Sequence, residues 1–211
     1  MKTKKITQNL ILDFDDTLFY TLPVVMAYIN QTYGIESKES DYLDNSGFHK
    51  IIQKYTNNPL ITFEEVYNSY RINFALSPKW HKDVEPMAHV CKVVPELAKK
   101  YNLFIATMRS DRGAYLVNGL LESYIPKCIK MVHYAIRYKE KENTYWEFPK
   151  KDFILGLKGK NVAFIDDTLK EVQRVKDFCP SLLLDPKNKY GCLAEEVQSV
   201  RSWEEIGKRF L

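Results

Sequence analysis

Short apolar runs alternate with longer amphipathic stretches along this chain. The runs are continuously apolar, which is typical of parallel strands that are covered on both faces. The predicted strands are residues 9–14, 103–107, 161–166 and 181–185, with residues 129–132 as a further candidate. Helical periodicity is found in residues 84–101, 111–124, 152–157 and 169–178. Strands that alternate with helices predict an α/β fold, with a Rossmann-like core of three layers around a central parallel sheet.

The stretch between the first two predicted strands does not fit a simple connection. It is far longer than the roughly 10–12 residues that a strand-to-strand crossover needs. Helical patterns of its own cover residues 22–33, 40–55 and 62–76. Gly34 is placed to end the first helix, and Thr62 and Glu65 have the spacing of a capping box at the start of the third. The predicted domains are therefore a core and an inserted α-helical subdomain, residues 1–21 with 84–211 and residues 22–83.

Composition narrows the class of protein. The chain has 211 residues, which fits one large domain or one domain with an insert. It has no apolar run near the roughly 18–20 residues of a membrane helix, and no signal-peptide-like stretch precedes Asp13. We therefore expect a cytoplasmic protein with no membrane partner. The four cysteines are too widely spaced for a paired-cysteine metal motif. A net charge of +4 suits an anionic substrate and does not demand nucleic acid.

Acidic residues follow two of the predicted strands. The segment Asp-Phe-Asp-Asp-Thr, residues 13–17, comes at the end of the first strand, and Asp166 with Asp167 ends another. Charges in apolar surroundings must be paired or neutralised. Because ligands bind beyond the carboxyl ends of the strands in an open parallel sheet, we expect these carboxylates to meet there with Thr107. Carboxylate oxygens are ligands that Mg²⁺ prefers, so the pattern predicts a Mg²⁺ site.

The same residues resemble the motifs of the haloacid dehalogenase superfamily of phosphohydrolases. Residues 13–17 match its first motif, Asp-x-Asp-x-Thr, including the preceding apolar strand. Thr107 matches the second motif, a Thr or Ser after an apolar strand, and Asp166-Asp167 matches the fourth motif, an acidic pair. The resemblance covers the core of the chain, residues 7–17 and 84–185.

The third motif of that superfamily is a single lysine upstream of the acidic pair. Lys150 and Lys151 are adjacent candidates, while Lys158 and Lys160 lie closer to the strand. We favour Lys151, because a helix that starts with Lys, Asp and an apolar residue resembles several members of the superfamily.

The resemblance implies a catalytic role for four residues. Asp13 would attack the phosphoryl group and carry it covalently, and Asp15 would act first as general acid and then as general base. Thr107 would hydrogen-bond a phosphoryl oxygen. Lys151 would neutralise both the nucleophile and the transferring group.

The resemblance also implies a metal-binding set. Asp13, the backbone carbonyl of Asp15 and the acidic pair would hold Mg²⁺. Within the pair, Asp167 fits the usual ligand position better, with Asp166 either a direct ligand or a residue behind the ligands. The sequence leaves two positions open for Arg109, two residues after Thr107. It either faces the substrate phosphate or lies exposed to solvent at the start of a helix.

The function that the resemblance implies is a Mg²⁺-dependent phosphatase acting on a small phosphomonoester through an aspartyl-phosphate intermediate. Asp15 argues against a dehalogenase, since the dehalogenases of the superfamily lack this second aspartate. Its phosphatases and phosphomutases have it, because an alkoxide leaving group needs a proton, and of these two activities hydrolysis is the commoner. The insert would be a cap over the active site, which favours a small substrate, and aromatic side chains that stack on bases favour a nucleotide.

Two alternatives stay open. One is a polynucleotide end-processing phosphatase, suggested by the basic and aromatic residues 133–151. The other is a non-catalytic binding module on the same scaffold.

Overall fold

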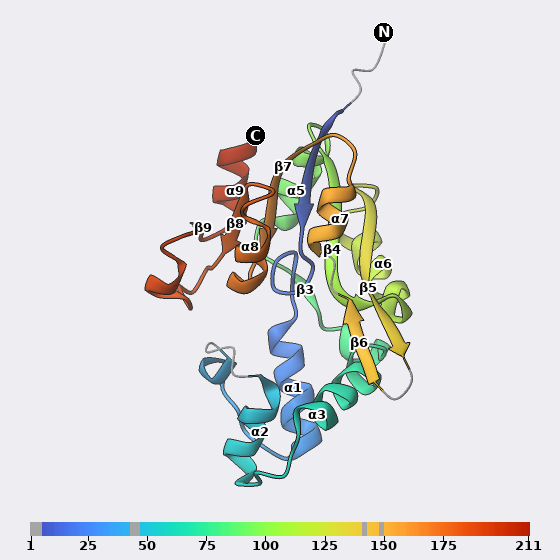
Figure 1. The fold of residues 1–211 in the computed structure, drawn as a ribbon, viewed down its shortest axis with the longest axis vertical. Coiled ribbons are helices and arrows are strands. Elements are labelled where there is room, and N and C mark those ends of the chain that lie inside the picture. Colours follow the sequence, from blue (N-terminus) through green and yellow to red (C-terminus); the bar gives the residue numbers. More distant parts are fainter. Residues whose placement is uncertain (1–5, 43–46, 141–142, 148–149) are drawn as a thin grey trace. The chain divides into compact units, whose positions relative to one another are not determined.

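The computed structural model describes residues 6–42, 47–140, 143–147 and 150–211. The chain forms two compact units, of which one combines Met1–Phe19 with Pro86–Leu211 and the other is Tyr20–Glu85 (Figure 1). Two short strands, β2 (Phe19–Tyr20) and β3 (Glu85–Pro86), lie where the chain passes from one unit to the other, and they pair with each other.

A seven-stranded sheet forms the centre of the larger unit. Its strands, in spatial order, are β6 (Asn143–Glu147), β5 (Ile129–Glu140), β4 (Asn102–Ser110), β1 (Gln8–Leu12), β7 (Lys160–Asp166), β8 (Ser181–Leu184) and β9 (Gln198–Val200). All neighbours from β5 to β9 pair in parallel, and β6 pairs antiparallel with β5. This sheet confirms the predicted α/β class and the four predicted strands. β9 was not predicted, because its three residues include two polar ones and show no apolar run.

The register of the central strands decides where the candidate site residues lie. Leu12 of β1 pairs with Ile105 of β4 on one side and with Ile165 of β7 on the other. The residues that follow these three strand positions therefore emerge at the same edge of the sheet. The regular pairing of β4 with β5 breaks after Ala106, although β4 itself continues to Ser110.

Helices cover both faces of this sheet. They are α5 (Val90–Ala98), α6 (Ala114–Tyr124), α7 (Lys150–Gly156), α8 (Leu169–Val175) and α9 (Trp203–Phe210), with short 3₁₀ turns η3 (Asp111–Gly113) and η4 (Gly191–Ala194). In Figure 1, α7 lies in front of the sheet and α5 lies behind it. On the α7 side, Ile154 and Val175 pack on the strand residues Ile11, Ala106 and Phe164. These apolar layers confirm the three-layer core and hold the strand ends in fixed positions.

The smaller unit is helical. Its elements are α1 (Leu22–Tyr33), the 3₁₀ turn η1 (Glu39–Tyr42), α2 (Phe48–Thr56), α3 (Phe63–Ser69), the π-helical turn η2 (Tyr70–Phe74) and α4 (Pro78–His81). Gly34 ends α1 with φ 64°, and Thr62 with Glu65 forms the predicted capping box. Tyr28 packs its ring against Phe74 and Trp80. The helix expected at residues 40–55 is shorter: it starts at Phe48, after residues 43–46, which lie outside the described residues.

The basic and aromatic segment at residues 133–151 forms most of a β-hairpin. β5 extends to Glu140 and β6 returns along it, with Tyr138 opposite Tyr145. Residues 141–142 and 148–149 lie outside the described residues. The hairpin extends one edge of the sheet. Among the helices that the structure describes, none has the length and apolar character needed to cross a bilayer.

Candidate active site

Hydrogen bonds fix the loop after β1 at its start, at Asp13, and at its end, at Thr17. The Asp13 N–H donates to the carbonyl of Ile165 at 2.8 Å, so the end of β1 is tied to β7. Asp16 has a left-handed φ of 51°, which lets the chain turn sharply there. Thr17 is buried, and its Oγ1 accepts a hydrogen bond from the Asp167 N–H at 3.1 Å. The first motif and the acidic pair are therefore held together by one backbone hydrogen bond and by the Thr17 hydroxyl.

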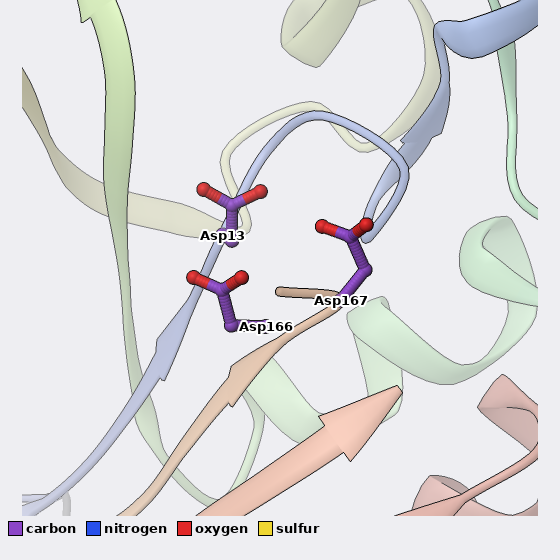
Figure 2. A group of neighbouring side chains, drawn as sticks. All are labelled: Asp13, Asp166 and Asp167. Carbon is purple, nitrogen blue, oxygen red and sulfur yellow. The ribbon is translucent and has the colours of Figure 1, made fainter. Parts of the chain in front are cut away.

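Three carboxylates converge beyond these strand ends. One carboxylate oxygen from each of Asp13, Asp166 and Asp167 lies within 4.8 Å of the other two (Figure 2). Asp13 and Asp166 are buried, and Asp167 is partly buried. Burial raises the pKa of Asp13 well above its usual value, and although Lys150 lowers it, the repulsion from the other carboxylates raises it further. The pKa of Asp167 is raised as well, mainly by burial. A closely spaced set of oxygen donors with this excess of negative charge fits a divalent cation such as Mg²⁺.

Lys150 bridges two of these carboxylates. Its Nζ lies 2.7 Å from Asp13 Oδ1 and 2.7 Å from Asp166 Oδ2, and the residue is buried. Burial alone would lower the pKa of Lys150, but Asp13 and Asp166 outweigh burial and raise it, so the side chain stays charged.

This contact corrects the choice of lysine. Lys151 is exposed, and its Nζ lies 4.1 Å from the centroid of the Phe178 ring, away from the carboxylates. Successive residues of an α-helix point about 100° apart, so only one of two adjacent lysines at the start of α7 can face the strand ends. The structure places Lys150 there.

The two members of the acidic pair have different surroundings. Asp166 Oδ2 contacts Lys150, and its Oδ1 accepts a hydrogen bond from the Thr168 N–H at 2.8 Å. Asp167 Oδ2 accepts from Lys189 Nζ at 2.9 Å, and within the described part of the chain its Oδ1 has a single long contact, 3.4 Å from Thr168 Oγ1. Because both Asp166 oxygens have short partners, the geometry favours Asp167 as the direct metal ligand and Asp166 as the residue that holds Lys150.

Lys189 was missed by the sequence analysis. It belongs to the loop after β8, and no motif of the sequence points to it. The carboxylate of Asp167 raises the pKa of Lys189 above its usual value, against the opposing effect of burial. Only the position of β8 beside β7 in the sheet could have indicated that this loop reaches the acidic pair.

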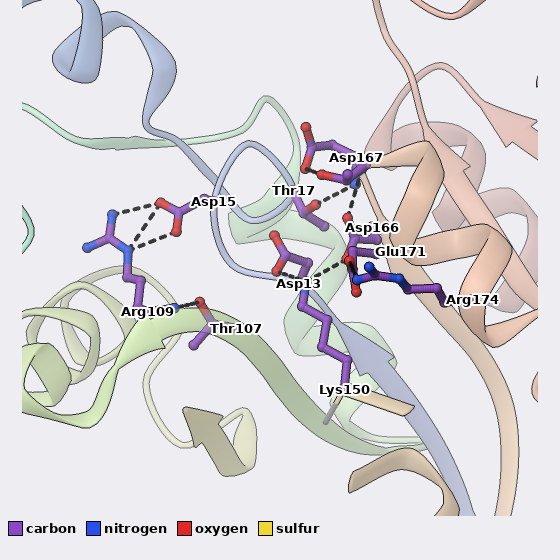
Figure 3. A network of polar contacts seen from close by, with 11 residues as sticks. Asp13, Asp15, Thr17, Thr107, Arg109, Lys150, Asp166, Asp167, Glu171 and Arg174 are labelled. Carbon is purple, nitrogen blue, oxygen red and sulfur yellow. Dashed lines mark hydrogen bonds and ion pairs between the residues drawn. The ribbon is translucent and has the colours of Figure 1, made fainter. Parts of the chain in front are cut away.

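Asp15 and Arg109 form a further ion pair, apart from the three carboxylates (Figure 3). Arg109 Nη2 lies 2.7 Å from Asp15 Oδ1, and its Nε lies 2.9 Å from Oδ2. The side chain of Arg109 is only 5% exposed, against 30% for Asp15. The guanidinium carbon lies 5.0 Å from the centroid of the Phe14 ring. Arg109 is therefore not a solvent-exposed residue at a helix start, because β4 continues past Thr107 and carries it inward.

Thr107 lies between these two groups in Figure 3. It is buried, and its Oγ1 accepts a hydrogen bond from the Arg109 N–H at 3.1 Å. That bond leaves the hydroxyl hydrogen of Thr107 for donation to a ligand oxygen. Of the predicted site residues, the structure thus brings together Asp13, Asp166 and Asp167, with Asp15, Thr107 and Arg109 beside them.

Comparison with known proteins gives matches of structure only. A scan against models of protein families finds no match, and a search of curated proteins finds none. Among solved structures, a haloacid dehalogenase-like hydrolase from Streptococcus pneumoniae gives a TM-score of 0.68 at 13% identity, covering 96% of this chain and 98% of that chain. A predicted phosphatase from Clostridium acetobutylicum gives 0.69 at 15% identity, covering 97% of this chain and 98% of that one.

A magnesium-bound structure is also among the similar ones. A protein from Bacillus subtilis, provisionally assigned as a HAD-hydrolase and bound to magnesium, gives a TM-score of 0.63 at 12% identity, covering 98% of this chain and 99% of that chain. At such identities the likeness establishes the fold alone. The chain has the fold of haloacid dehalogenase-like hydrolases, as its sequence motifs predict.

Proposed function

We propose that this protein is a Mg²⁺-dependent phosphatase that hydrolyses a small phosphomonoester through an aspartyl-phosphate intermediate. The observation that carries the proposal is the surroundings of Asp13. This buried carboxylate lies at a strand end, has a buried lysine at 2.7 Å, and shares its site with two further carboxylates within 4.8 Å. A carboxylate so placed is suited to attack phosphorus, and the ammonium of Lys150 offsets its repulsion by an anionic substrate.

The metal set that fits best is Asp13 with Asp167. Asp166 is not a direct ligand in this set. It holds Lys150 in place through the ion pair between the two side chains. The backbone carbonyl of Asp15 completes the set that the motif resemblance implies. When bound, Mg²⁺ would stabilise the negative charge that develops on the transferring phosphoryl oxygens.

The reaction would proceed in two displacements. In the first, an Asp13 oxygen forms a bond to phosphorus as the bond from phosphorus to the ester oxygen breaks, and Asp15 donates a proton to that leaving oxygen. In the second, Asp15 takes a proton from a water molecule whose oxygen attacks phosphorus, and the bond to Asp13 breaks. Thr107 would donate its hydroxyl to a phosphoryl oxygen, and Lys150 would keep the nucleophile close to the reacting phosphorus.

Arg109 gives the first displacement an additional requirement. Its guanidinium engages both oxygens of Asp15, so this contact must open before Asp15 delivers a proton. A phosphate dianion attracts a guanidinium as strongly as a carboxylate does. We therefore expect substrate binding to draw Arg109 toward the phosphate and to release Asp15 for proton transfer.

A substitution at Asp13 tests the reaction class. Asp13→Asn removes the nucleophile, and phosphate release from an aryl phosphate in the presence of Mg²⁺ should fall by at least about 10³-fold. Asp16→Asn is the matched control, because it makes the same change in the same loop, and Asn tolerates the left-handed backbone there. Undiminished turnover by the Asp13 variant would refute the proposal.

The substrate class needs a separate screen. Nucleotides, sugar phosphates and phosphorylated oligonucleotide ends are compared with and without Mg²⁺, and we expect a small phosphomonoester, a nucleotide first, to be the preferred substrate. Preference for oligonucleotide ends would support the end-processing alternative. Release of no phosphate from any ester would support the non-catalytic alternative. The cap role of residues 22–83 stays a prediction that rests on the motif resemblance.

A further inference from the structure

Lys189 is a third cation at the candidate site, and the two-displacement reaction does not use it. Its side chain is 19% exposed, and its Nζ lies 2.9 Å from Asp167 Oδ2 and 4.9 Å from the centroid of the Tyr190 ring. Lys150 is already paired with Asp13 and Asp166. Lys189 therefore offsets the charge of the carboxylate that best fits the metal.

The loop that carries Lys189 is built to hold it in place. Asp185 is buried at the end of β8, and its two carboxylate oxygens accept hydrogen bonds from the N–H groups of Lys189 at 2.8 Å and Tyr190 at 3.3 Å. Arg201 donates to the carbonyl of Asp185 and to Asn188 Oδ1, both at 2.7 Å. These contacts hold the backbone at residues 188–190. The contact of Lys189 with Asp167 therefore differs from that of a lysine on a flexible surface segment.

The sheet brings this loop to the acidic pair. β8 runs parallel to β7, and Leu183 pairs with Asp166. The loop after β8 therefore begins beside the residue that follows Asp166, which is Asp167. Strand order thus places the start of this loop near the acidic pair, and the contacts of Asp185 and Arg201 hold the loop from there.

A divalent ion at Asp167 and the ammonium of Lys189 oppose each other. Two positive charges about 4–5 Å apart repel strongly where water is largely excluded. Without metal, the lysine provides the positive charge that the partly buried carboxylate needs. We propose that Lys189 is a tethered cation that competes with the divalent ion for Asp167 and so lowers the affinity of the site for metal. This inference rests on the proposed metal site.

If Lys189 instead orients Asp167 for the metal, the predicted change in metal affinity has the opposite sign. Lys189 holds one Asp167 oxygen and could thereby orient the other toward the metal, as hydrogen-bonding partners of metal ligands often do. An orienting lysine increases metal affinity, and its loss weakens binding. The two roles are distinguished by the direction in which metal affinity changes when the charge is removed and a hydrogen-bond donor is kept.

The test measures binding of Mn²⁺ alone by electron paramagnetic resonance and binding of Mg²⁺ alone by calorimetry, without substrate. Lys189→Gln removes the charge and retains a donor for Asp167, and Lys189→Met removes both. We expect both variants to bind metal at least about tenfold more tightly, a factor that corresponds to about 1.4 kcal/mol. Lys189→Arg keeps the charge and should leave the affinity near that of the wild type.

A control variant separates local competition from a general charge effect. Lys170→Met makes the same charge change on α8, three residues after Asp167, at an exposed side chain. We expect at most about a twofold change in metal affinity there, since exposed charges are screened. The rise in Tm on addition of Mg²⁺ should likewise be larger for the Gln variant than for the wild type or the Lys170 variant.

The outcomes distinguish this inference from the proposed function. If wild type binds metal and both neutral Lys189 variants bind it equally or more weakly, the competition is refuted and the metal site stands. If neither wild type nor the variants bind metal, the metal site itself is refuted, and the competition with it. Tighter binding by Lys170→Met as large as that by Lys189→Gln would also overturn the inference, because a general charge effect would then explain both.

Discussion

Lys150 and Lys151 are neighbours in the sequence, yet they have unlike surroundings. One is buried between two carboxylates, and the other is exposed and lies over the ring of Phe178. The motif identifies the segment, because a lysine is needed near the nucleophile. It does not identify the residue, because a shift of one position turns a helical side chain by about 100°. The sequence predicts residue types more reliably than it predicts which of two adjacent residues faces the site.

The pair of lysines provides a matched mutational test. Lys150→Met leaves Asp13 and Asp166 buried without their shared cation, which should destabilise the metal-free protein by about 3–5 kcal/mol. It should also slow phosphate release by at least about 10²-fold, the size of effect seen when one stabilising donor is removed from an active site. Lys151→Met should stay within about 0.5 kcal/mol of wild type. Urea unfolding with a chelator and a phosphate-release assay measure the two effects; a larger effect at Lys151 would contradict the placement.

The strands determine which distant residues become neighbours. Leu12 pairs with both Ile105 and Ile165, so three strand ends meet at one edge and bring Asp13, Thr107 and the acidic pair together. Apolar runs followed by carboxylates were sufficient to predict this convergence. They did not predict the contact of Lys189, because nothing in the local sequence shows which strand stands next to β7. They also did not place Arg109, because the length of β4 beyond Thr107 depends on tertiary pairing.

The junction between β1 and β7 depends on a glycine. Gly159 precedes β7 with φ +106°, and a Cβ there would lie 2.5 Å from the carbonyl oxygen of Thr7. That carbonyl accepts the Lys160 N–H at 3.0 Å, which starts the pairing of the two strands. A side chain at Gly159 would therefore disturb the register on which the site depends.

Gly159→Ala tests this dependence at the level of the strand pair. The left-handed φ and the clash should destabilise the protein by about 1–3 kcal/mol. Gly119→Ala is the control of opposite sign: it lies within α6, and among the described residues a Cβ there would meet open space. Ala in a helix interior is favoured over Gly by about 0.5–1 kcal/mol, so this variant should be more stable than wild type. Equal midpoints of urea unfolding for the two variants would show that the β1–β7 junction tolerates a side chain.

At the scale of the whole molecule, the chain combines an α/β unit with a helical one, and the candidate site residues lie in the first. The α/β unit was predictable, because few other folds can bury continuous apolar strands that alternate with amphipathic helices. The capping box at Thr62 and the end of α1 at Gly34 were predictable from local residue types. The substrate was not predictable, since it depends on which side chains of several segments face the phosphate.

The acidic cluster links the stability of the whole molecule to pH and metal. In the metal-free protein, the pKa of Asp13 is raised above its unfolded value of 3.8, so the folded state binds this proton more tightly than the unfolded state does. The resulting contribution to stability is present at low pH and is lost as pH rises through the raised pKa. A divalent ion reverses the preference, because it favours the ionised carboxylate. Mg²⁺ should therefore raise Tm more at pH 8 than at pH 5, and Asp167, whose pKa is also raised, adds to this difference. Asp13→Asn should reduce the rise at pH 8, because it removes both a proposed metal ligand and a titrating carboxylate. Thermal unfolding with Mg²⁺ and with a chelator at the two pH values measures the difference; an equal rise at both would mean that neither Asp13 nor Asp167 changes its protonation when metal binds.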